Sequence, residues 1–311
     1  MLFTTLNTLA CDICNMSVSL TPDDTKNTIS LLYRHRLASR TFSQLTYTEA
    51  LPQSVNRHSG VMLIPGLEEQ RQKETYSVYE LRGLYNFNNR ISFLGSIPMI
   101  HNERLINESK QFQVEGIGDP IAMMRYNLVR TNQTDHSKAN HRLTLGAGIK
   151  IPLGKCDFES NGRIVEHDIQ AGTGTLDAVF SLDYMWKYKK YGVLLNSNFK
   201  VNTMNKKVDY MFGNTSNTTL NTFYQYSVSK KVTLLPYAGT YIEIAGRDIE
   251  HKQYEENTGG KLLFGNIGCQ LFVGKIRIDT QFQHTLINQL NGTFQLNTKN
   301  RWQVGVTYLL N

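Results

Sequence analysis

Apolar and polar residues alternate with a period of two in twelve separate segments of the chain. In the clearest segment, residues 142–153, apolar side chains occupy every second position from Leu143 to Leu153, with polar residues, glycine or proline between them. A helix would scatter this set around its axis, whereas a strand places all of it on one face. The twelve predicted strands lie near residues 29–37, 79–87, 91–99, 122–128, 142–153, 176–186, 193–201, 220–228, 232–242, 263–273, 276–282 and 302–310.

The lengths of the connections also alternate along the chain. Connections after even-numbered segments are short, as at Asn88-Asn89 and Val273–Lys275, apart from residues 130–141. Connections after odd-numbered segments are long and cover about 38–74, 101–119, 155–175, 203–217, 244–259 and 288–299. Outer-membrane barrels have an even number of strands, with short periplasmic turns at one rim and long loops at the other. We therefore predict an all-β fold, a transmembrane antiparallel up-and-down β-barrel of about 12 strands, over residues 29–311.

Residues 1–28 precede the first predicted strand. The stretch from Met1 to Leu9 is short and weakly apolar and contains no basic residue. We interpret it as the remnant of an export signal, followed by a segment that lies in the periplasm or in the lumen. Because residues 12–28 carry the acidic pair Asp23-Asp24 and the predicted lumen carries several arginines, we predict that this segment enters the barrel and narrows it.

Charged residues in mid-strand decide which face of the predicted strands points inward. Lipid would cost roughly 2–4 kcal/mol for each Arg or Lys at the bilayer midplane, whereas a wet lumen accommodates mixed, paired charges. The apolar faces, which include Leu145 and Val304, are therefore predicted to contact lipid. The residues predicted to line the lumen and the path of a solute are Arg34, Arg36, Glu80, Arg82, Arg125, Asp177, Asp183, Asn196, Asn198, Lys200, Arg277 and Asp279. We expect these residues both to stiffen the wall as a paired network and to form a polar constriction that selects solutes.

Aromatic residues gather beside the short connections. Tyr85, Phe87 and Trp186 are examples, and such positions are typical of the aromatic girdle at a membrane interface. The turns also hold lysines, Lys189 and Lys190 among them, which suit anionic lipid headgroups and equally well a solvated turn.

The composition agrees with a barrel and excludes other classes. Charged residues make up only 19% of the 311 residues, below the roughly 25% usual for soluble domains. No run approaches the roughly 18 apolar residues of a membrane-spanning helix. The net charge of +7 comes without any Lys/Arg run longer than two residues, so no nucleic-acid partner is expected.

Several motifs resemble one known family. They are Gly116-Ile117-Gly118-Asp119 before a strand with Tyr126, LGAGIKIPLGK at 145–155, GTGTLDAVFSLDY at 172–184, and CDIC at 11–14 ahead of Tyr33-Arg34-His35-Arg36. These stretches resemble the outer-membrane transporter family associated with meta-pathway phenol degradation, over most of residues 11–201. Where relatives with a cysteine-rich start have a further cysteine, this chain has Asn15-Met16. The resemblance implies a barrel transporter whose small solutes include apolar or aromatic molecules.

Cys11 and Cys14 form a C-x-x-C pair with three possible roles. An oxidising periplasm favours a disulfide or an inert pair, Cys11 could carry a lipid, and the two thiols are weak candidates for metal ligands. No His-x-x-His and no second C-x-x-C completes a tetrahedral metal site. We therefore predict no resident metal and no cofactor.

The sequence offers little that could support catalysis. Gly116-x-Gly-Asp119 lacks the third glycine and the following helix of a dinucleotide site, so it is interpreted as a tight turn into a strand. The serine-hydrolase motif G-x-S-x-G is absent, and His284, on the eleventh predicted strand, has no serine two positions away. An embedded hydrolase that uses His284 is the third and weakest candidate, and we predict that the protein is not an enzyme.

The most consistent prediction is a transporter or channel of the bacterial outer membrane for small solutes, passive or gated by its N-terminal segment. Its partners would be the lipid bilayer and the solute. The alternative is a closed structural or docking barrel whose long extracellular loops face a protein partner.

Overall fold

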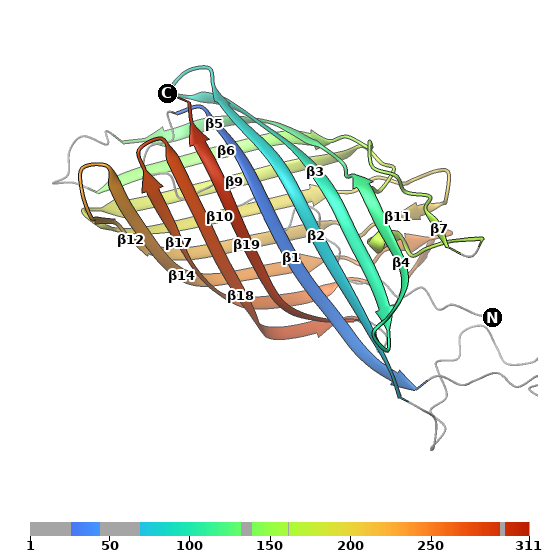
Figure 1. Cartoon of the computed structure of the whole chain (residues 1–311). Helices are drawn as coiled ribbons and strands as arrows, with labels where there is room; N and C mark the ends of the chain where they lie inside the picture. The colour runs from blue at the N-terminus through green and yellow to red at the C-terminus, as the bar shows by residue number, and fades with distance from the viewer. Residues whose placement is uncertain (1–25, 44–68, 132–138, 161, 293–295, 311) are drawn as a thin grey trace, which may run out of the picture.

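A computed structural model describes residues 26–43, 69–131, 139–160, 162–292 and 296–310. Twelve antiparallel strands close into a barrel (Figure 1), which confirms the predicted fold class. The barrel strands are β1 (Thr28–Ser43), β2 (Glu69–Asn86), β3 (Ile91–Ile106), β5 (Ile121–Arg130), β6 (Asn140–Lys150), β9 (Asp177–Tyr188), β10 (Tyr191–Val201), β12 (Thr215–Tyr224), β14 (Val232–Ala245), β17 (Gly260–Val273), β18 (Ile276–Leu290) and β19 (Asn297–Leu309).

The barrel closes between its first and last strands, as predicted. β1 pairs with β19 from Thr28↔Leu309 to Ser39↔Asn297, with a shift in register after Arg36. The start of β1 and the end of β19 therefore lie at the rim that also carries the turns at 189–190 and 274–275, which we call the short-turn rim. The opposite rim, the long-loop rim, carries the long connections.

Short elements decorate both rims. They are β4 (Ser109–Ile117), β7 (Glu159–Ser160), β8 (Arg163–Ile164), the 3-10 helix η1 (His167–Ile169), β11 (Tyr210–Met211), β13 (Tyr226–Ser227), β15 (Ile249–Glu250) and β16 (Gln253–Tyr254). Within the described ranges, no helix has the length and apolar character needed to cross a bilayer.

Several strands extend further at the long-loop rim than the sequence predicts. β1 continues to Ser43 and β2 already begins at Glu69, although 38–74 was expected to be a loop. In the expected loop 101–119, β3 continues to Ile106 and turns back as β4. The added stretches are rich in polar residues on both faces, so the alternation that reveals a strand disappears where neither face needs to contact lipid.

β3 changes its partner halfway along its length. Ile91–Ser96 pair with β5, whereas Met99–Ile106 pair with β4. Pro98 lies at the change of partner, where its missing N–H costs no ladder hydrogen bond. Its carbonyl oxygen accepts a hydrogen bond from the N–H of Gly118 at 2.8 Å.

The two faces of the wall differ sharply in exposure. Apolar side chains on the outer face are open, as in Leu31 (60% exposed), Leu81 (51%) and Val306 (50%). Charged side chains in the middle of these strands point inward, and Glu80 is only 2% exposed. This arrangement is the one that a bilayer requires of a barrel.

The inner face is less uniformly polar than the sequence analysis assumed. Three apolar clusters lie on it, and all were missed because a buried apolar residue on the polar face breaks the alternation without signalling where it points. The first cluster contains Leu94, Ile121, Met123 and Val179, the second contains Met185, Leu194, Phe223 and Leu235, and the third contains Tyr241, Leu262 and Phe264.

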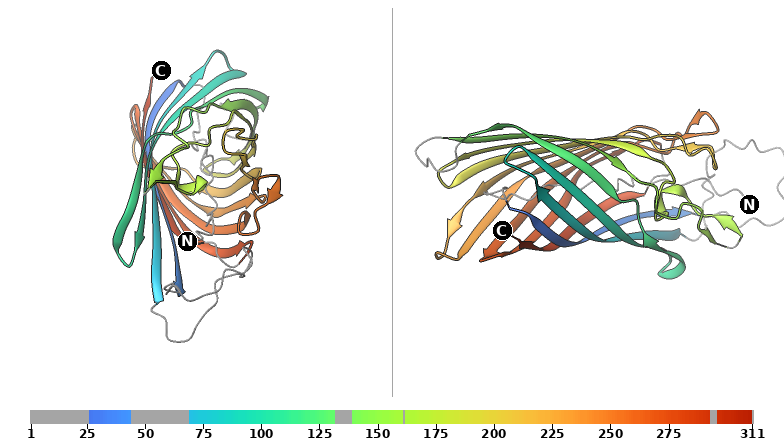
Figure 2. Two further views of the ribbon diagram at one scale, coloured as in Figure 1. Left: turned by 90° about the vertical axis from the view of Figure 1, so that its right-hand side faces the viewer. Right: turned by 90° about the horizontal axis from the view of Figure 1, so that it is seen from above.

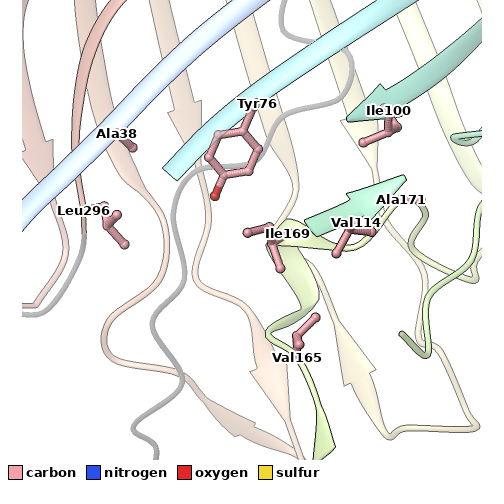
Figure 3. Close-up of a cluster of buried hydrophobic side chains, with 8 residues drawn as sticks. All are labelled: Ala38, Tyr76, Ile100, Val114, Val165, Ile169, Ala171 and Leu296. Carbon is pink, nitrogen blue, oxygen red and sulfur yellow. The ribbon is translucent and has the colours of Figure 1, made fainter. Parts of the chain in front are cut away.

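Residues 151–176, which we call the inner segment, lie at the long-loop rim, and their part around η1 reaches into the barrel. Seen from that end, the yellow-green chain around β7 and β8 crosses the opening of the ring of strands (Figure 2, left), and the other views place these two short strands beyond the ends of the wall (Figure 1; Figure 2, right). Ile169 of this segment is fully buried. It belongs to an apolar cluster that joins the inner segment to the wall (Figure 3). The other members are Ala38 on β1, Tyr76 on β2, Ile100 on β3, Val114 on β4, Val165 and Ala171 in the inner segment, and Leu296 just before β19.

Candidate functional site: the lumen

All twelve residues predicted to line the lumen lie on the inward face of their strands. Ten of them are buried, while Arg34 and Arg36 are half-buried. Their burial shows that side chains fill much of the interior. Their role in the path of a solute remains a prediction.

The charges of the inner wall are paired across neighbouring strands. Glu80 lies between Arg34 and Arg82, with nitrogen–oxygen distances of 2.7 Å to each. Further round the wall, Arg125 on β5 donates to Asp183 on β9 at 2.8 Å. Asp183 also accepts a hydrogen bond from Asn196, which begins a chain of amides.

That chain continues along the next strands. The side-chain amide of Asn198 donates to the carbonyl oxygens of Asn196 (2.9 Å) and Asn217 (3.1 Å). On β18, Arg277 donates to Asp279 at 2.8 Å and to Thr307 at 2.7 Å. Hydrogen bonds that join strands in this way stiffen the wall.

Lys150 lies at the centre of the most deeply buried charge cluster among the described residues, and it is not one of the twelve residues predicted from the sequence to line the lumen. Its Nζ lies 2.9 Å from Asp119 and 2.8 Å from Asp177, and all three side chains are inaccessible to solvent. Lys150 ends the polar face of the clearest predicted strand, and Asp119 ends the motif Gly116–Asp119. Their positions were therefore visible in the sequence, but their contact was not.

This cluster brings together the three glycine-rich motifs that carry the family resemblance. Asp119 of the first motif accepts hydrogen bonds from the N–H groups of Gly154 in the second (2.8 Å) and Thr173 in the third (2.9 Å). A Cβ on Gly154 would lie 2.6 Å from the Cα of Gly172, so both positions require glycine for the backbones to approach. The motifs therefore fix the two ends of the inner segment to the wall.

Arg104 on β3 holds the middle of the inner segment. Its Nη1 donates to both carboxylate oxygens of Glu166 at 2.7 Å, and its Nε donates to Glu74 at 2.7 Å. The amide of Asn102, two residues earlier on the same face, donates to the carbonyl oxygen of Ile169 at 3.0 Å. The inner segment is thus fixed in the lumen by charge as well as by apolar packing.

A second polar cluster joins the inner segment to the neighbouring loops. The ring of His167 stacks on Tyr210 with centroids 3.9 Å apart, and the Tyr210 hydroxyl donates to Asp248. Burial lowers the pKa of His167 to about 4. Burial also raises the pKa of Asp248 to about 6, although Tyr210 and the N–H of Gly213 donate hydrogen bonds to it and oppose that rise. Three loops of the long-loop rim therefore meet at one titratable cluster.

Among the described residues, the remaining sequence candidates for chemistry form no site. Cys11 and Cys14 lie outside the described residues, so their role remains a prediction. Among the residues that the structure describes, no group of three His, Cys, Asp or Glu is placed to hold a metal ion. His284 is exposed, and its Nδ1 lies 2.8 Å from the amide oxygen of Asn300.

No family model matches the chain, and no curated protein is similar to it at a significant level. Solved structures do share its fold. An outer membrane channel from Pseudomonas putida F1 superposes with a TM-score of 0.63 at 12% identity, over 94% of this chain and 100% of that one.

More distant structures include a FadL homologue of Pseudomonas aeruginosa (TM-score 0.45, 10% identity, 93% of this chain and 91% of that one). The β domain of Bordetella BrkA superposes with a TM-score of 0.47 at 9% identity, over 92% of this chain and 100% of that one. These two scores are too low to support any argument. The closed barrel, its apolar outer wall and the first likeness together identify the chain as a β-barrel of the bacterial outer membrane.

Proposed function

We propose that this protein is a channel for small solutes, narrowed at the long-loop rim by its inner segment. The observation that carries the proposal is the attachment of that segment inside the ring of strands, through Arg104–Glu166 and through the Asp119 cluster. A segment fixed across a lumen lined with polar residues restricts which solutes pass and leaves a path for some of them.

Apolar or aromatic solutes are the proposed substrate class. The family resemblance implies them. The residues proposed to line the path are the twelve residues predicted from the sequence.

Gating by the N-terminal segment is a further part of the proposal. The carbonyl of Lys26 accepts a hydrogen bond from the side-chain amide of Asn86 (2.9 Å), and the side chain of Asn27 accepts one from the Asn86 N–H (2.7 Å). These bonds fix the last residues before β1 at the short-turn rim, beside the lumen. Residues 12–25 lie outside the described residues.

Conductance measurements test the proposal directly. The purified barrel in planar bilayers should show discrete channels, and the conductance should rise when residues 12–25 are deleted. The matched control replaces the same residues with a Gly/Ser linker of equal length, which separates the specific sequence from simple bulk. A folded barrel, identified by heat-modifiable gel mobility, that never conducts would contradict the channel function.

A closed docking barrel is the second candidate function. It is favoured by the near-complete burial of the inner wall, where Glu80, Asp183 and Lys200 are each 2% exposed. Such a barrel would exclude solutes in liposome swelling assays while its long loops bind a protein partner.

A further inference from the structure

Six residues form a cationic and amide-rich patch on the inner faces of three neighbouring strands. Arg36, Arg301 and Gln283 lie side by side in one row across β1, β19 and β18. Arg34, Gln303 and Gln281 form the adjacent row. We call these six residues the Arg301 patch, and none of them is acidic.

Arg301 at the centre of this patch uses only part of its guanidinium group. Its Nη1 donates to Oε2 of Glu243 at 2.8 Å. Among the described residues, nothing accepts a hydrogen bond from its Nε or Nη2, although the residue is only 5% exposed. Arg277, one strand away, instead has both Nε and Nη2 satisfied.

The neighbours of Arg301 also present unused polar atoms. Gln283 is 1% exposed, and neither its amide nitrogen nor its amide oxygen has a partner within the described part of the chain. The same is true of the amide oxygen of Gln303 and of Nε of Arg34. Buried polar groups without partners lower the stability of a protein, and charged groups do so most. Several of them on one patch indicate a site built for a further partner.

The geometry of the free edge specifies the chemistry of that partner. The Nε–Nη2 edge of a guanidinium group presents two parallel N–H donors, which match the two oxygens of a carboxylate. The guanidinium group of Arg301 lies over two aromatic rings, with its Cζ 4.3 Å from the ring centroid of Phe264 and 5.8 Å from that of Tyr241. A cation–π contact of this kind requires no N–H donor.

We infer that the Arg301 patch binds the carboxylate of a small amphipathic acid, whose apolar or aromatic body lies near Tyr241 and Phe264. Arg301 pairs with the carboxylate through Nε and Nη2, and Gln283 donates a third hydrogen bond from its amide nitrogen. Glu243 holds the opposite end of the guanidinium group and thereby orients it. This inference rests on the proposed channel function, since the acid reaches the patch through the lumen.

Calorimetric titration of the purified, detergent-folded barrel with benzoate tests the inference, with benzamide as the uncharged analogue. Benzoate should bind at least roughly tenfold more tightly than benzamide, as expected for hydrogen bonds to a charged group. Arg301→Lys keeps a positive charge for Glu243 and so preserves the fold, but it removes the two-donor edge. This variant should lose that preference, and Gln283→Leu should weaken benzoate binding severalfold.

The matched control is Lys299→Gln, which removes one positive charge from an exposed position on the same strand. It should bind benzoate as the wild type does. Equal affinity for benzoate and benzamide, or unchanged benzoate affinity in Arg301→Lys, would overturn the site and leave water as the partner of these groups. Conductance of the same preparations keeps the two proposals apart. Channels without selective benzoate binding would refute only the site, and benzoate binding without channels would refute only the transport function.

Discussion

Arg104 on β3 donates from Nη1 to both carboxylate oxygens of Glu166, at 2.7 Å each, and thereby joins the barrel wall to the inner segment. The same guanidinium group contacts Glu74 on β2. One arginine thus connects two strands of the wall with the segment proposed to narrow the lumen.

Glu166→Gln should widen the proposed channel. The substitution keeps the size of the side chain but removes the charge that Arg104 holds, so the inner segment should leave the wall more often. We expect a higher single-channel conductance in planar bilayers. The control is Lys110→Gln, which removes an exposed ion pair with Glu103 (3.5 Å, Lys110 side chain 49% exposed) and should leave conductance unchanged. Identical conductance of Glu166→Gln and the wild type would show that this contact does not hold the constriction.

Lys150→Met should destabilise the barrel strongly. It leaves Asp119 and Asp177 buried without their cation, and breaking a buried ion pair in this way costs about 3–5 kcal/mol. Lys73→Met, which removes a partly exposed pair with Glu108 at 3.9 Å, should cost no more than about 1 kcal/mol. Urea unfolding in detergent, followed by gel mobility, measures both. A Lys150→Met barrel as stable as Lys73→Met would refute the structural role of this cluster.

The loops of the long-loop rim should respond to pH through two opposing groups. Burial lowers the pKa of His167 from 6.5 to about 4. Between these two pH values His167 binds a proton more strongly in the open loops than in the closed loops. The closed state of the loops therefore becomes more stable as pH rises. Burial raises the pKa of Asp248 from 3.8 to about 6. Between these two pH values Asp248 binds a proton more strongly in the closed loops than in the open loops. The closed state therefore becomes less stable as pH rises.

Separating the two groups exposes each effect. In Asp248→Asn only the His167 effect remains, and the loops should become more resistant to limited proteolysis as pH rises from about 4 to 6.5. In His167→Phe, which keeps a ring against Tyr210, resistance should instead fall between pH 3.8 and about 6. The same pH profile in both variants would contradict this assignment.

A charge on the outer wall should block assembly. Leu145→Arg places an arginine in the middle of β6 on the lipid face, at a cost of about 2–4 kcal/mol near the bilayer midplane. Leu153→Arg, just beyond the end of the strand and 66% exposed, should be tolerated. The fraction of heat-modifiable barrel after folding into liposomes compares them. Equal yields would mean that Leu145 does not face lipid.

The architecture was predictable because the bilayer acts on every strand in the same way. Apolar residues alternate with other residues at Leu145, Ala147 and Ile149, and the same pattern recurs in the other segments. Together with the alternation of short and long connections, it predicts a closed barrel and tells which face of each strand contacts lipid. The prediction weakened at the ends of β1, β2 and β3, because outside the bilayer no rule separates the two faces. Leu94 and Met123 were missed for a related reason, since apolar residues on an inward face contact each other instead of lipid.

The strands, their order and the two faces of the wall could be predicted from the amino-acid pattern, because period-two burial in a bilayer is a local property of each segment. Asp119, Lys150 and Gly172 could also be recognised as parts of motifs. Three relationships emerge only in the folded barrel: the motifs meet, the inner segment reaches into the lumen, and Arg301 keeps a free edge beside Phe264. Those relationships depend on contacts between residues far apart in the chain. The free energy of such contacts comes from the pairing of side chains inside the closed barrel, which local periodicity does not reveal.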